Sequence, residues 1–450
     1  MLIRFSVENF LSFREETEFS MIPGRARKHP NHLIKDEAWN GINLLKGAVI
    51  YGANASGKSN FVKALEFCRE LIVEGTHARR QISVPVFRFD EACKERPATF
   101  KIEIKVRDDY YAYGFEVLPD RIVSEWLYAI TKTTNKVIFE RTTVEGQTQV
   151  EFGSIDFEDR EEEKFLQFVG RGTRPNKLFL SESIERGVKR FERVFNWFDR
   201  TLVIVFPESQ FVDLETSIRD NELFRSSIEH LLKSFNTGIA RLGLQQIQYD
   251  ADLELPKDFR SSIEADLDTG QQVIVRGPDR RRFMFEKAED GTYVASELVA
   301  EHDVKGKSNR EPLEFAYESD GTQRLLDLIP GFLSLINDQR VLVIDELDRS
   351  LHPALSYALI ELFLDGTADQ ASQLVATTHE TGLLDLDLLR RDEIWFVEKN
   401  GEGATSMYSL EEFTPRYDRD IRKGYLLGRF GAIPVVHDVG DLEWAKGDAS

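Results

Sequence analysis

A glycine-rich loop near the N-terminus has the residue types and the spacing of a phosphate-binding site. Gly52 is followed by four residues and then by Gly57-Lys58-Ser59, within the stretch YGANASGKSN at 51–60. Glycines let the backbone turn so that its N–H groups face phosphate oxygens, the lysine reaches the β- and γ-phosphates, and the hydroxyl coordinates Mg²⁺. The loop therefore predicts a site for a nucleoside triphosphate with Mg²⁺.

The flanks of this loop supply the strand and the helix that such a site needs. An apolar run at 48–51 predicts a buried strand, and the apolar spacing of 61–72 predicts a helix whose positive N-terminal end faces the same anion. These flanks disfavour the alternative of an ordinary glycine turn. We expect the following loop residues to contact the nucleotide: Gly52, Asn54, Ser56, Gly57, Lys58, Ser59 and Asn60.

Two carboxylates follow a second apolar strand. Residues 341–344 are all aliphatic and lead directly into Asp345 and Glu346. A buried parallel strand places the residues at its carboxyl end on the edge of the sheet where ligands bind. We expect Asp345 to hold Mg²⁺ with Ser59, and Glu346 to orient and deprotonate the attacking water. Two solvated acids at a strand end are the alternative.

A third apolar strand, 372–378, leads into His379 and should lie beside the strand that ends in Asp345. Neighbouring strands that end in Asp-Glu and in His resemble the core of the ABC-type ATPases. In that family the histidine is a switch that contacts the γ-phosphate. The resemblance therefore implies a catalytic role for His379 beside Lys58 and Glu346, whereas a lone histidine is otherwise more often structural.

Further motifs match this family. Ser319-Asp320-Gly321 heads an apolar helix and resembles the ABC signature, which binds the γ-phosphate of the nucleotide held by the other subunit. Asp320 stands where the family usually has glycine, and an ordinary helix cap is the alternative. Asp348 fits the family's D-loop at the dimer interface. Gln81 is a candidate for the Q-loop on position alone.

The charge balance argues against a general affinity for nucleic acid. The chain has 78 acidic and 58 basic residues and a formal net charge of −20. Phosphate neutralisation drives non-specific binding to nucleic acid, so such binding is not favoured, although a local basic groove stays open. The densest basic stretch is 276–283, where we favour a hairpin turn at Gly277-Pro278-Asp279.

Cysteine content and hydropathy predict a cytoplasmic protein without a membrane span. The 450 residues include only two cysteines, which fits a reducing compartment. No apolar run approaches the length of a membrane span, and the N-terminus is too broken by charge to be a signal peptide. We expect Cys68 in the core and Cys93 on the surface. Asp385 and Asp387 resemble a metal-binding pair but are more simply the solvated face of a short helix.

The periodicity predicts an α/β fold with two kinds of sheet. Alternation at 98–106 and 110–118 predicts a hairpin, and the meander continues to about residue 152, so an antiparallel sheet follows the first helix. The first 21 residues predict two strands. Helices are expected after residue 157, a buried strand at 201–207, and a long helix at 214–243, alternatively two helices broken near Asn236. Hairpins follow at 271–295.

These elements suggest four segments. Residues 1–156 form the N-terminal half of the ATPase core, and 157–310 form an inserted helical and hairpin subdomain that serves as a lid or assembly surface. Residues 311–433 form the C-terminal half of the core, with 434–450 as a flexible tail. The predicted fold class is therefore α/β, an ABC-type ATPase head with a mixed sheet, a P-loop core, an antiparallel β subdomain and an insert.

The motifs resemble the soluble clamp branch of ABC-type ATPases, which includes Rad50, SMC, RecF and the OLD proteins. The helical stretches are too poor in heptads for the long coiled coil of Rad50 or SMC. The 71 residues after His379 are too few for the TOPRIM nuclease of an OLD protein. The chain resembles phage-defence and abortive-infection ATPases of the AbiL/RloA kind, with AriA of the PARIS system as a cousin. The segments that carry this resemblance are MLIRFSVENFLSFREETEFSM, YGANASGKSN, PVFRFD, ESDGTQRLLDLIP, DELDRSLHP, TTHET and GYLLGRFGAIPVV.

This resemblance implies a head-to-head dimer, or a higher homo-oligomer, with ATP and Mg²⁺ between the subunits. The ATPase would sense infection, with a phage protein as a candidate trigger. It would then hold or release an effector encoded nearby, an RloB-like protein or a TOPRIM-family nuclease. The alternative is a RecF- or Rad50-like repair clamp that grips duplex DNA. The large apolar residues of GYLLGRFGAIP at 424–434 serve either core packing or an exposed docking strip.

Overall fold

The chain forms two compact units. The computed structural model describes residues 1–35, 42–132, 134–153, 157, 159–247, 267–277, 280–368, 370–413 and 420–433. The first unit comprises Met1–Pro207, Leu335–Leu347 and Ile360–Ser450, and the second comprises Glu208–Ser334 and Asp348–Leu359. The second unit therefore begins later than the insert expected at 157–310. The predicted tail at 434–450 lies outside the described residues.

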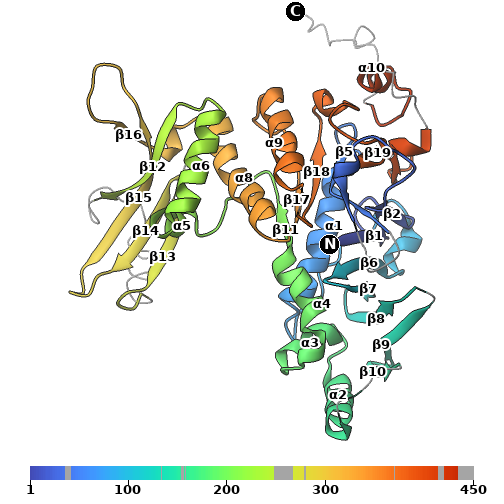
Figure 1. Ribbon diagram of the computed structural model, residues 1–450. Helices are drawn as coiled ribbons and strands as arrows, with labels where there is room; N and C mark the ends of the chain where they lie inside the picture. Colours follow the sequence, from blue (N-terminus) through green and yellow to red (C-terminus); the bar gives the residue numbers. More distant parts are fainter. Residues whose placement is uncertain are drawn as a thin grey trace, which may run out of the picture. The chain divides into compact units, whose positions relative to one another are not determined.

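A six-stranded sheet forms the centre of the first unit (Figure 1). Five strands are parallel, and β20 pairs antiparallel with β19 at one edge. In spatial order the strands are β11 (Leu202–Val205), β17 (Val341–Ile344), β18 (Gln373–Thr378), β5 (Gly47–Tyr51), β19 (Ile394–Lys399) and β20 (Thr405–Ser409). Every residue of β5, β17 and β18 is buried, as continuous apolar runs predict for parallel strands covered on both faces.

A seven-stranded antiparallel sheet forms the second layer of this unit. In spatial order its strands are β10 (Gln147–Phe152), β9 (Asn135–Val144), β8 (Arg121–Ile130), β7 (Asp109–Leu118), β6 (Ala98–Val106), β1 (Leu2–Glu8) and β2 (Thr17–Ser20). Val106 pairs with Asp109 at the turn of the predicted hairpin, and β1 pairs with β2 as predicted. The expected antiparallel sheet and the α/β class are therefore confirmed.

Helix α1 (Lys58–Val73) contributes to the apolar core that joins the two sheets. Phe61 of α1 makes edge-on ring contacts with Phe5 of β1 and Phe19 of β2, at centroid distances of 5.7 and 5.1 Å. Burying each such ring stabilises the fold by about 1.5–3 kcal/mol. The helix that carries Lys58 at its first position is thereby fixed against both sheets.

Short helices complete the first unit. They are α2 (Arg160–Gly172), α3 (Phe179–Glu185), α4 (Glu192–Asn196), a π-helical turn (Trp197–Thr201) and α10 (Ile421–Leu426). Within the stretch after residue 157 where helices are predicted, the chain turns at Gly187, whose φ of 78° no regular helix tolerates. Buried Glu125 of β8 accepts hydrogen bonds from the N–H groups of Phe179 and Leu180, and its burial raises the pKa of its carboxyl.

The second unit contains a five-stranded antiparallel sheet with two helices packed on it. Its strands are β12 (Ile239–Ile247), β15 (Tyr293–His302), β14 (Arg282–Lys287) and β13 (Gln272–Arg276), with β16 (Glu311–Glu314) pairing β15. The helices are α5 (Leu214–Asp220) and α6 (Glu222–Ser234). The predicted β13–β14 hairpin is confirmed, although Pro278 and Asp279 of its turn lie outside the described residues.

The prediction of a helix throughout 214–243 is wrong. The helix breaks at Asn221, whose side chain accepts a hydrogen bond from the N–H of Phe224 and caps α6. It then ends before Asn236 and Gly238, which have left-handed φ values of 55° and 82°. The residues that follow pair with β15 instead, because tertiary pairing outweighs their weak helical periodicity.

The remaining elements are β3 (Leu33–Ile34), β4 (Leu44–Leu45), α8 (Asp320–Asn337) and α9 (Pro353–Gly366). Cys68 is buried as predicted, but the surface position predicted for Cys93 is wrong. Cys93 packs with Phe87 and Ala404, and its carbonyl accepts a hydrogen bond from the Asn9 side chain that holds it inside.

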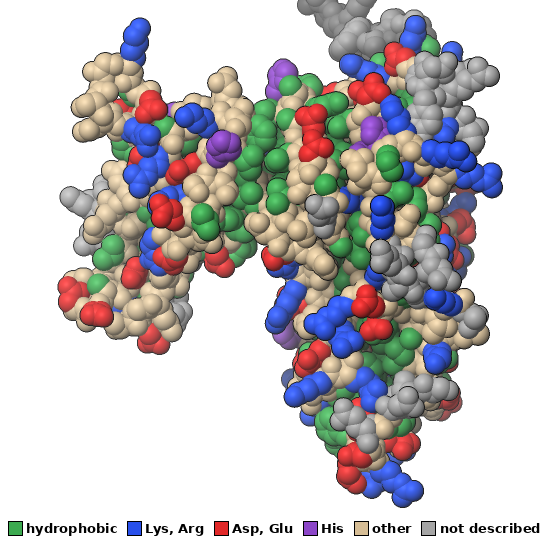
Figure 2. Space-filling view, in the orientation of Figure 1, with side chains coloured by type: hydrophobic (Ala, Val, Ile, Leu, Met, Phe, Trp, Pro, Cys, Tyr) green, Lys and Arg blue, Asp and Glu red, His purple; other side chains and the backbone are tan. Residues whose placement is uncertain are grey.

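Acidic and basic side chains are interspersed on the face of the molecule in view, without a broad field of one sign (Figure 2). Asp387 forms an ion pair with Lys28, and this cation lowers the pKa of the Asp387 carboxyl. In the described ranges no cluster of three or more His, Cys, Asp or Glu side chains could hold a metal ion. The same ranges contain no helix long and apolar enough to cross a bilayer.

Candidate functional site

The phosphate loop connects β5 to α1, and its backbone requires both of its glycines. A Cβ atom at Gly52 would lie 2.4 Å from the carbonyl oxygen of Val397, and one at Gly57 would lie 2.4 Å from Oγ1 of Thr405. Gly57 also has a φ of 119°, which side chains rarely permit. Helix α1 has no side-chain cap, so its first N–H groups keep their capacity to bind an anion.

Lys58 lies inside the loop with a side chain that is only 5% exposed. Its Nζ donates hydrogen bonds to the carbonyl oxygens of Gly52 at 2.8 Å and Ala53 at 3.2 Å. The same Nζ lies 3.5 Å from Nδ1 of His379. The cation is thus held at the place where phosphate oxygens would meet the loop, and such oxygens would compete with the two carbonyls for its protons.

Asp345 and Glu346 are oriented by one hydroxyl group. Thr377 Oγ1 donates a hydrogen bond of 2.6 Å to Oδ1 of buried Asp345, and it accepts one of 2.8 Å from the backbone N–H of Glu346. Glu346 has a left-handed φ of 51°, which costs energy for any residue other than glycine. Residues in such strained conformations cluster at functional sites. The turn therefore directs the side chains of Asp345 and Glu346 differently, which suits the two tasks predicted for them, holding Mg²⁺ and orienting water.

Strand β18 brings Lys58, Asp345 and His379 together. It pairs in parallel with β17 on one side and with β5 on the other. Its last residues therefore lie between the phosphate loop and the turn at Asp345-Glu346, which we call the carboxylate turn. The prediction that the strand ending before Asp345 (β17) lies beside the strand ending before His379 (β18) is confirmed. Thr377 contacts Asp345, and exposed His379, just beyond the strand, lies within reach of Lys58.

The donor set fits Mg²⁺ better than it fits a transition metal. Ser59 and Asp345 supply a hydroxyl and a carboxylate, the hard oxygen ligands that Mg²⁺ prefers. Magnesium at nucleotide sites commonly uses one or two carboxylates and takes its other ligands from water and phosphate. A site with a single buried carboxylate braced by Thr377 therefore matches a metal that arrives with ATP.

A network of hydroxyl groups, which no sequence motif predicts, supports the phosphate loop. The side-chain amide of Asn60 donates to Ser12 Oγ at 2.7 Å, and Ser12 Oγ lies 2.8 Å from Thr405 Oγ1. The Thr405 hydroxyl in turn donates to the backbone carbonyl of Ser56 at 2.8 Å. Asn60 thus supports the loop through Ser12, and the Ser56 side chain is buried rather than directed to solvent.

A cavity of about 460 Å³ opens beside the phosphate loop. Asn54 is exposed at the tip of the loop and lines this cavity with His379, in a position to meet a bound nucleotide. The GYLLGRFGAIP segment contributes to the same wall through Tyr425 and Leu426. Tyr425 of this segment is buried, as core packing predicts, and Leu426 is exposed, while a docking role for the segment stays a prediction.

The signature segment lies in the second unit and begins α8. Ser319 Oγ accepts a hydrogen bond of 3.1 Å from the N–H of Thr322, which is the geometry of a helix cap. A Cβ atom at Gly321 would lie 2.7 Å from the backbone oxygen of Ser350, so only glycine fits there. Gly321 therefore packs directly against the segment that follows Asp348, the proposed D-loop.

The side chains of Gln323 and His302 brace the signature segment. The Gln323 side chain donates to three backbone carbonyls upstream of α8 and accepts a hydrogen bond of 3.3 Å from Arg280. His302 of β15 lies 2.6 Å from the carboxylate of Glu318, immediately before the signature serine. The hairpin sheet of the second unit thus fixes the conformation of the signature segment.

Gln81 lies at the opposite end of α1 from the phosphate loop. It lines a cavity with Glu70, Leu71 and Glu74, which belong to the last turns of the helix and the residue that follows it. A helix of 16 residues is about 24 Å long. Gln81 is therefore too far from the phosphates to serve as a Q-loop residue, and position along the chain was a poor guide.

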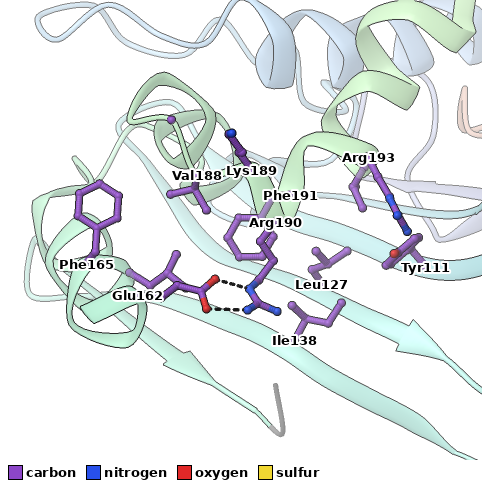
Figure 3. Close-up of a pocket in the computed structure, with 13 residues that line it drawn as sticks. Tyr111, Leu127, Ile138, Glu162, Phe165, Val188, Lys189, Arg190, Phe191 and Arg193 are labelled. Atoms are coloured by element: carbon purple, nitrogen blue, oxygen red, sulfur yellow. Dashed lines mark hydrogen bonds and ion pairs between the residues drawn. The ribbon is translucent and has the colours of Figure 1, made fainter. Parts of the chain in front are cut away.

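A separate cavity of about 610 Å³ lies between the antiparallel sheet and α2 (Figure 3). Glu162 and Arg190 form a two-pronged ion pair across it, with N···O distances of 2.8 and 2.7 Å. The ring of Tyr111 and the side chain of Arg193 line another part of its wall. None of its lining residues belongs to the phosphate loop, the carboxylate turn or β18.

Several solved structures resemble this chain at low sequence identity. An SMC head bound to the C-terminal winged-helix domain of ScpA is 15% identical, with a TM-score of 0.40 over 92% of this chain and 99% of that one. The SMC head domain from Thermotoga maritima is 10% identical, with a TM-score of 0.38 over 91% and 98%. An SMC head from Pyrococcus furiosus with the C-terminal domain of ScpA is 14% identical, with a TM-score of 0.37 over 92% and 97%. Likeness at this level says nothing about what this chain binds.

The comparison with protein families is more informative. No curated protein matches the chain. Residues 48–385 match the family described as "AAA domain, putative AbiEii toxin, Type IV TA system", and the match covers well over half of the chain. It includes the phosphate loop, the signature segment, the carboxylate turn and His379. The chain therefore belongs to this AAA family of AbiEii-type proteins.

Proposed function

We propose that the chain is an ATP-hydrolysing sensor and regulator subunit of a two-component antiphage system that acts by abortive infection. The observation that carries this proposal is the convergence of Lys58, His379 and the Asp345-Glu346 turn around the end of β18. A buried cation, an oriented carboxylate pair and an uncapped helix N-terminus are the parts that phosphoryl transfer to water requires.

Each residue has a defined task in the proposed reaction. Lys58 and the first N–H groups of α1 bind the phosphates, while His379 contacts the γ-phosphate at the mouth of the loop. Glu346 takes a proton from the attacking water as its oxygen bonds to the γ-phosphorus and the bond to the bridging oxygen breaks. Ser59 and Asp345 would hold Mg²⁺, which neutralises charge on the phosphates.

Two copies complete the site in this proposal. Ser319 and Gly321 of one copy bind the γ-phosphate held by the other, and Asp348 lies at the interface between them. The exposure of Ser319 and the glycine-only geometry at Gly321 support this assignment. Closing the dimer on ATP is the mechanical output, and hydrolysis reopens it.

The defence role is supported by the family match, whose description concerns abortive-infection toxins and toxin–antitoxin systems. In the proposed system the closed dimer, or a higher assembly of it, holds or releases a partner effector. An RloB-like protein or a TOPRIM-family nuclease encoded nearby is the expected effector, and a phage protein is the expected trigger. The particular likeness to AbiL, RloA and AriA belongs to this proposal.

A repair clamp that grips duplex DNA is the second candidate, and one feature favours it. Arg69, Arg200 and Arg340 line a cavity of about 400 Å³ at the edge strand β11. Each arginine is already paired with a nearby carboxylate, and the chain as a whole is strongly acidic. Both facts reduce the attraction to DNA phosphates, so this candidate ranks second.

Co-purification distinguishes the two candidates. Glu346→Gln protein is purified with ATP and Mg²⁺ from cells that also express the neighbouring gene, and Lys58→Ala protein from the same cells is the control. A stoichiometric complex in the first preparation, lost in the control, supports the two-component system and identifies its effector. A protein that emerges alone, dimerises with ATP and retains duplex DNA contradicts the defence role and supports the clamp.

A further inference from the structure

The C-terminal segment from Ile421 to Ile433 forms one wall of the cavity beside the phosphate loop. Tyr425, Leu426 and Ile433 line it on one side, and the first loop residues and His379 line it on the other. The wall thus stands at the γ-phosphate end of the proposed ATP site. A surface that approaches the γ-phosphate through this cavity would contact the segment.

Aromatic stacking fixes this segment to the central sheet. The ring of Tyr425 stacks on Phe396 at 5.5 Å with an interplanar angle of 13°, and its hydroxyl donates to the carbonyl of Ala432 at 3.0 Å. Phe430 stacks on the same Phe396 ring at 5.9 Å. Phe396 pairs with Tyr51 at the end of β5, so α10 is held in a fixed position beside the phosphate loop.

The outward face of this segment combines apolar and basic side chains. Leu426 is 58% exposed and Leu427 is 61% exposed, although both follow directly after buried Tyr425. Three exposed basic residues flank them along the same segment, and we name the five together the α10 face: Arg422, Lys423, Leu426, Leu427 and Arg429. Such a face fits a partner surface that is acidic with an exposed apolar or aromatic residue.

The signature segment offers that complementary surface. Tyr317 is 74% exposed two residues before Ser319. Exposed Glu314 and Asp320 lie three residues before and after it in the sequence, and exposed Glu311 pairs with Lys307. In the proposed dimer the signature of one copy approaches the γ-phosphate of the other, so these residues travel with it toward the cavity wall.

We propose that the α10 face is a docking surface for the signature segment of a second copy of this chain, and that it stabilises the ATP-closed dimer. The inference rests on the proposed dimeric ATPase function. Leu426 and Leu427 pack against the Tyr317 side of the second copy, and the basic residues face its acidic side chains. Closure on ATP then buries two leucines that are exposed in the single chain.

The test measures ATP-dependent mass by light scattering in the hydrolysis-deficient Glu346→Gln background. The parent protein should double its mass when ATP and Mg²⁺ are added. Adding Leu426→Asp and Leu427→Asp should weaken this dimer at least thirtyfold or so, because two carboxylates would enter an apolar contact facing acids. The single variant Leu427→Asp should weaken the dimer in the same direction. Because Leu427 does not line the cavity, its ATP binding, measured by calorimetry, should change by less than about threefold.

A matched control carries Val144→Asp and Phe168→Asp, which replace two other exposed apolar residues of the first unit outside the cavity wall. This control should dimerise as the parent does. A charge reversal, Lys423→Glu with Arg429→Glu, should also weaken the dimer, and adding Glu314→Lys should restore part of it.

The outcomes distinguish failure of the α10 face from failure of the dimeric ATPase on which it rests. If the parent dimerises and the double leucine variant dimerises equally well, the docking surface is refuted while the dimeric ATPase stands. If the parent binds ATP but stays a single chain, the proposed dimer itself is refuted. Loss of dimerisation in both the leucine variant and its control would also refute a specific α10 face.

Discussion

Replacing Lys58 with alanine should weaken ATP binding about a hundredfold to ten-thousandfold and leave no measurable hydrolysis. The amine is nearly buried and donates hydrogen bonds to the carbonyl oxygens of Gly52 and Ala53 at 2.8 and 3.2 Å. It is therefore already positioned in the loop to bind phosphate oxygens. Each hydrogen bond between a cation and an anion contributes about 1.5–3 kcal/mol, and ATP would lose about two of them. Titration calorimetry with ATP and Mg²⁺ measures the change directly.

Lys63→Ala is the matched control, because Lys63 lies on the same helix with its side chain exposed. It removes the same charge from the chain without touching the loop, and it should bind ATP as the wild type does. Equal loss in both variants would show that net charge rather than the position of Lys58 governs binding. Near-normal binding by Lys58→Ala would remove this lysine from the nucleotide site.

Replacing Glu346 with glutamine should reduce hydrolysis about a hundredfold to ten-thousandfold while preserving ATP binding. Glutamine has the same shape but cannot accept the proton of the attacking water. The backbone N–H of residue 346 keeps its hydrogen bond to Thr377, and the left-handed φ of 51° strains both side chains alike. The variant should therefore accumulate in the ATP-bound, closed state.

Phosphate release at saturating ATP measures this effect, with Glu361→Gln as the control. Glu361 lies exposed on α9, so its replacement makes the same chemical change away from the carboxylate turn. The control should turn over at the wild-type rate. Wild-type turnover in the Glu346→Gln protein would contradict the assignment of Glu346 as the base.

The sequence was sufficient to predict the phosphate loop and the strand that leads into Asp345, because the interactions that form them are local. Glycines at 52 and 57 and the aliphatic run at 341–344 have strong signatures, and strands of this kind pair in parallel when both faces are buried. The adjacency of β17 and β18 followed from two such runs close together in the chain. The antiparallel sheet followed from alternation and turn residues.

The support of the loop could not be predicted in this way. Thr405 contacts Ser56 across 349 residues and Ser12 across 393 residues, so only the folded chain brings the hydroxyls together. The same holds for Cys93, which a hydrogen bond from distant Asn9 draws inside. Single hydroxyl and thiol groups carry no periodicity that would reveal such long-range contacts.

The second unit was harder to predict for a different reason. Residues 239–247 have enough apolar spacing for a helix, but they find a strand partner in β15. The left-handed residues Asn236 and Gly238 were recognised as a break, yet the type of element beyond them depended on that partner. The prediction of Gln81 as the Q-loop residue failed for a similar reason, because its position along the chain does not reveal which end of α1 it lies near.

Complementation between two inactive variants tests the central claim most directly. Lys58→Ala and Ser319→Arg proteins should each fail to hydrolyse ATP alone, since one lacks the phosphate cation and the other blocks closure. In a mixed dimer, one site joins an intact loop to an intact signature, so mixing should restore up to about a quarter of wild-type phosphate release. Absence of any recovery on mixing, or full activity of Ser319→Arg alone, would contradict an ATP site shared between two copies.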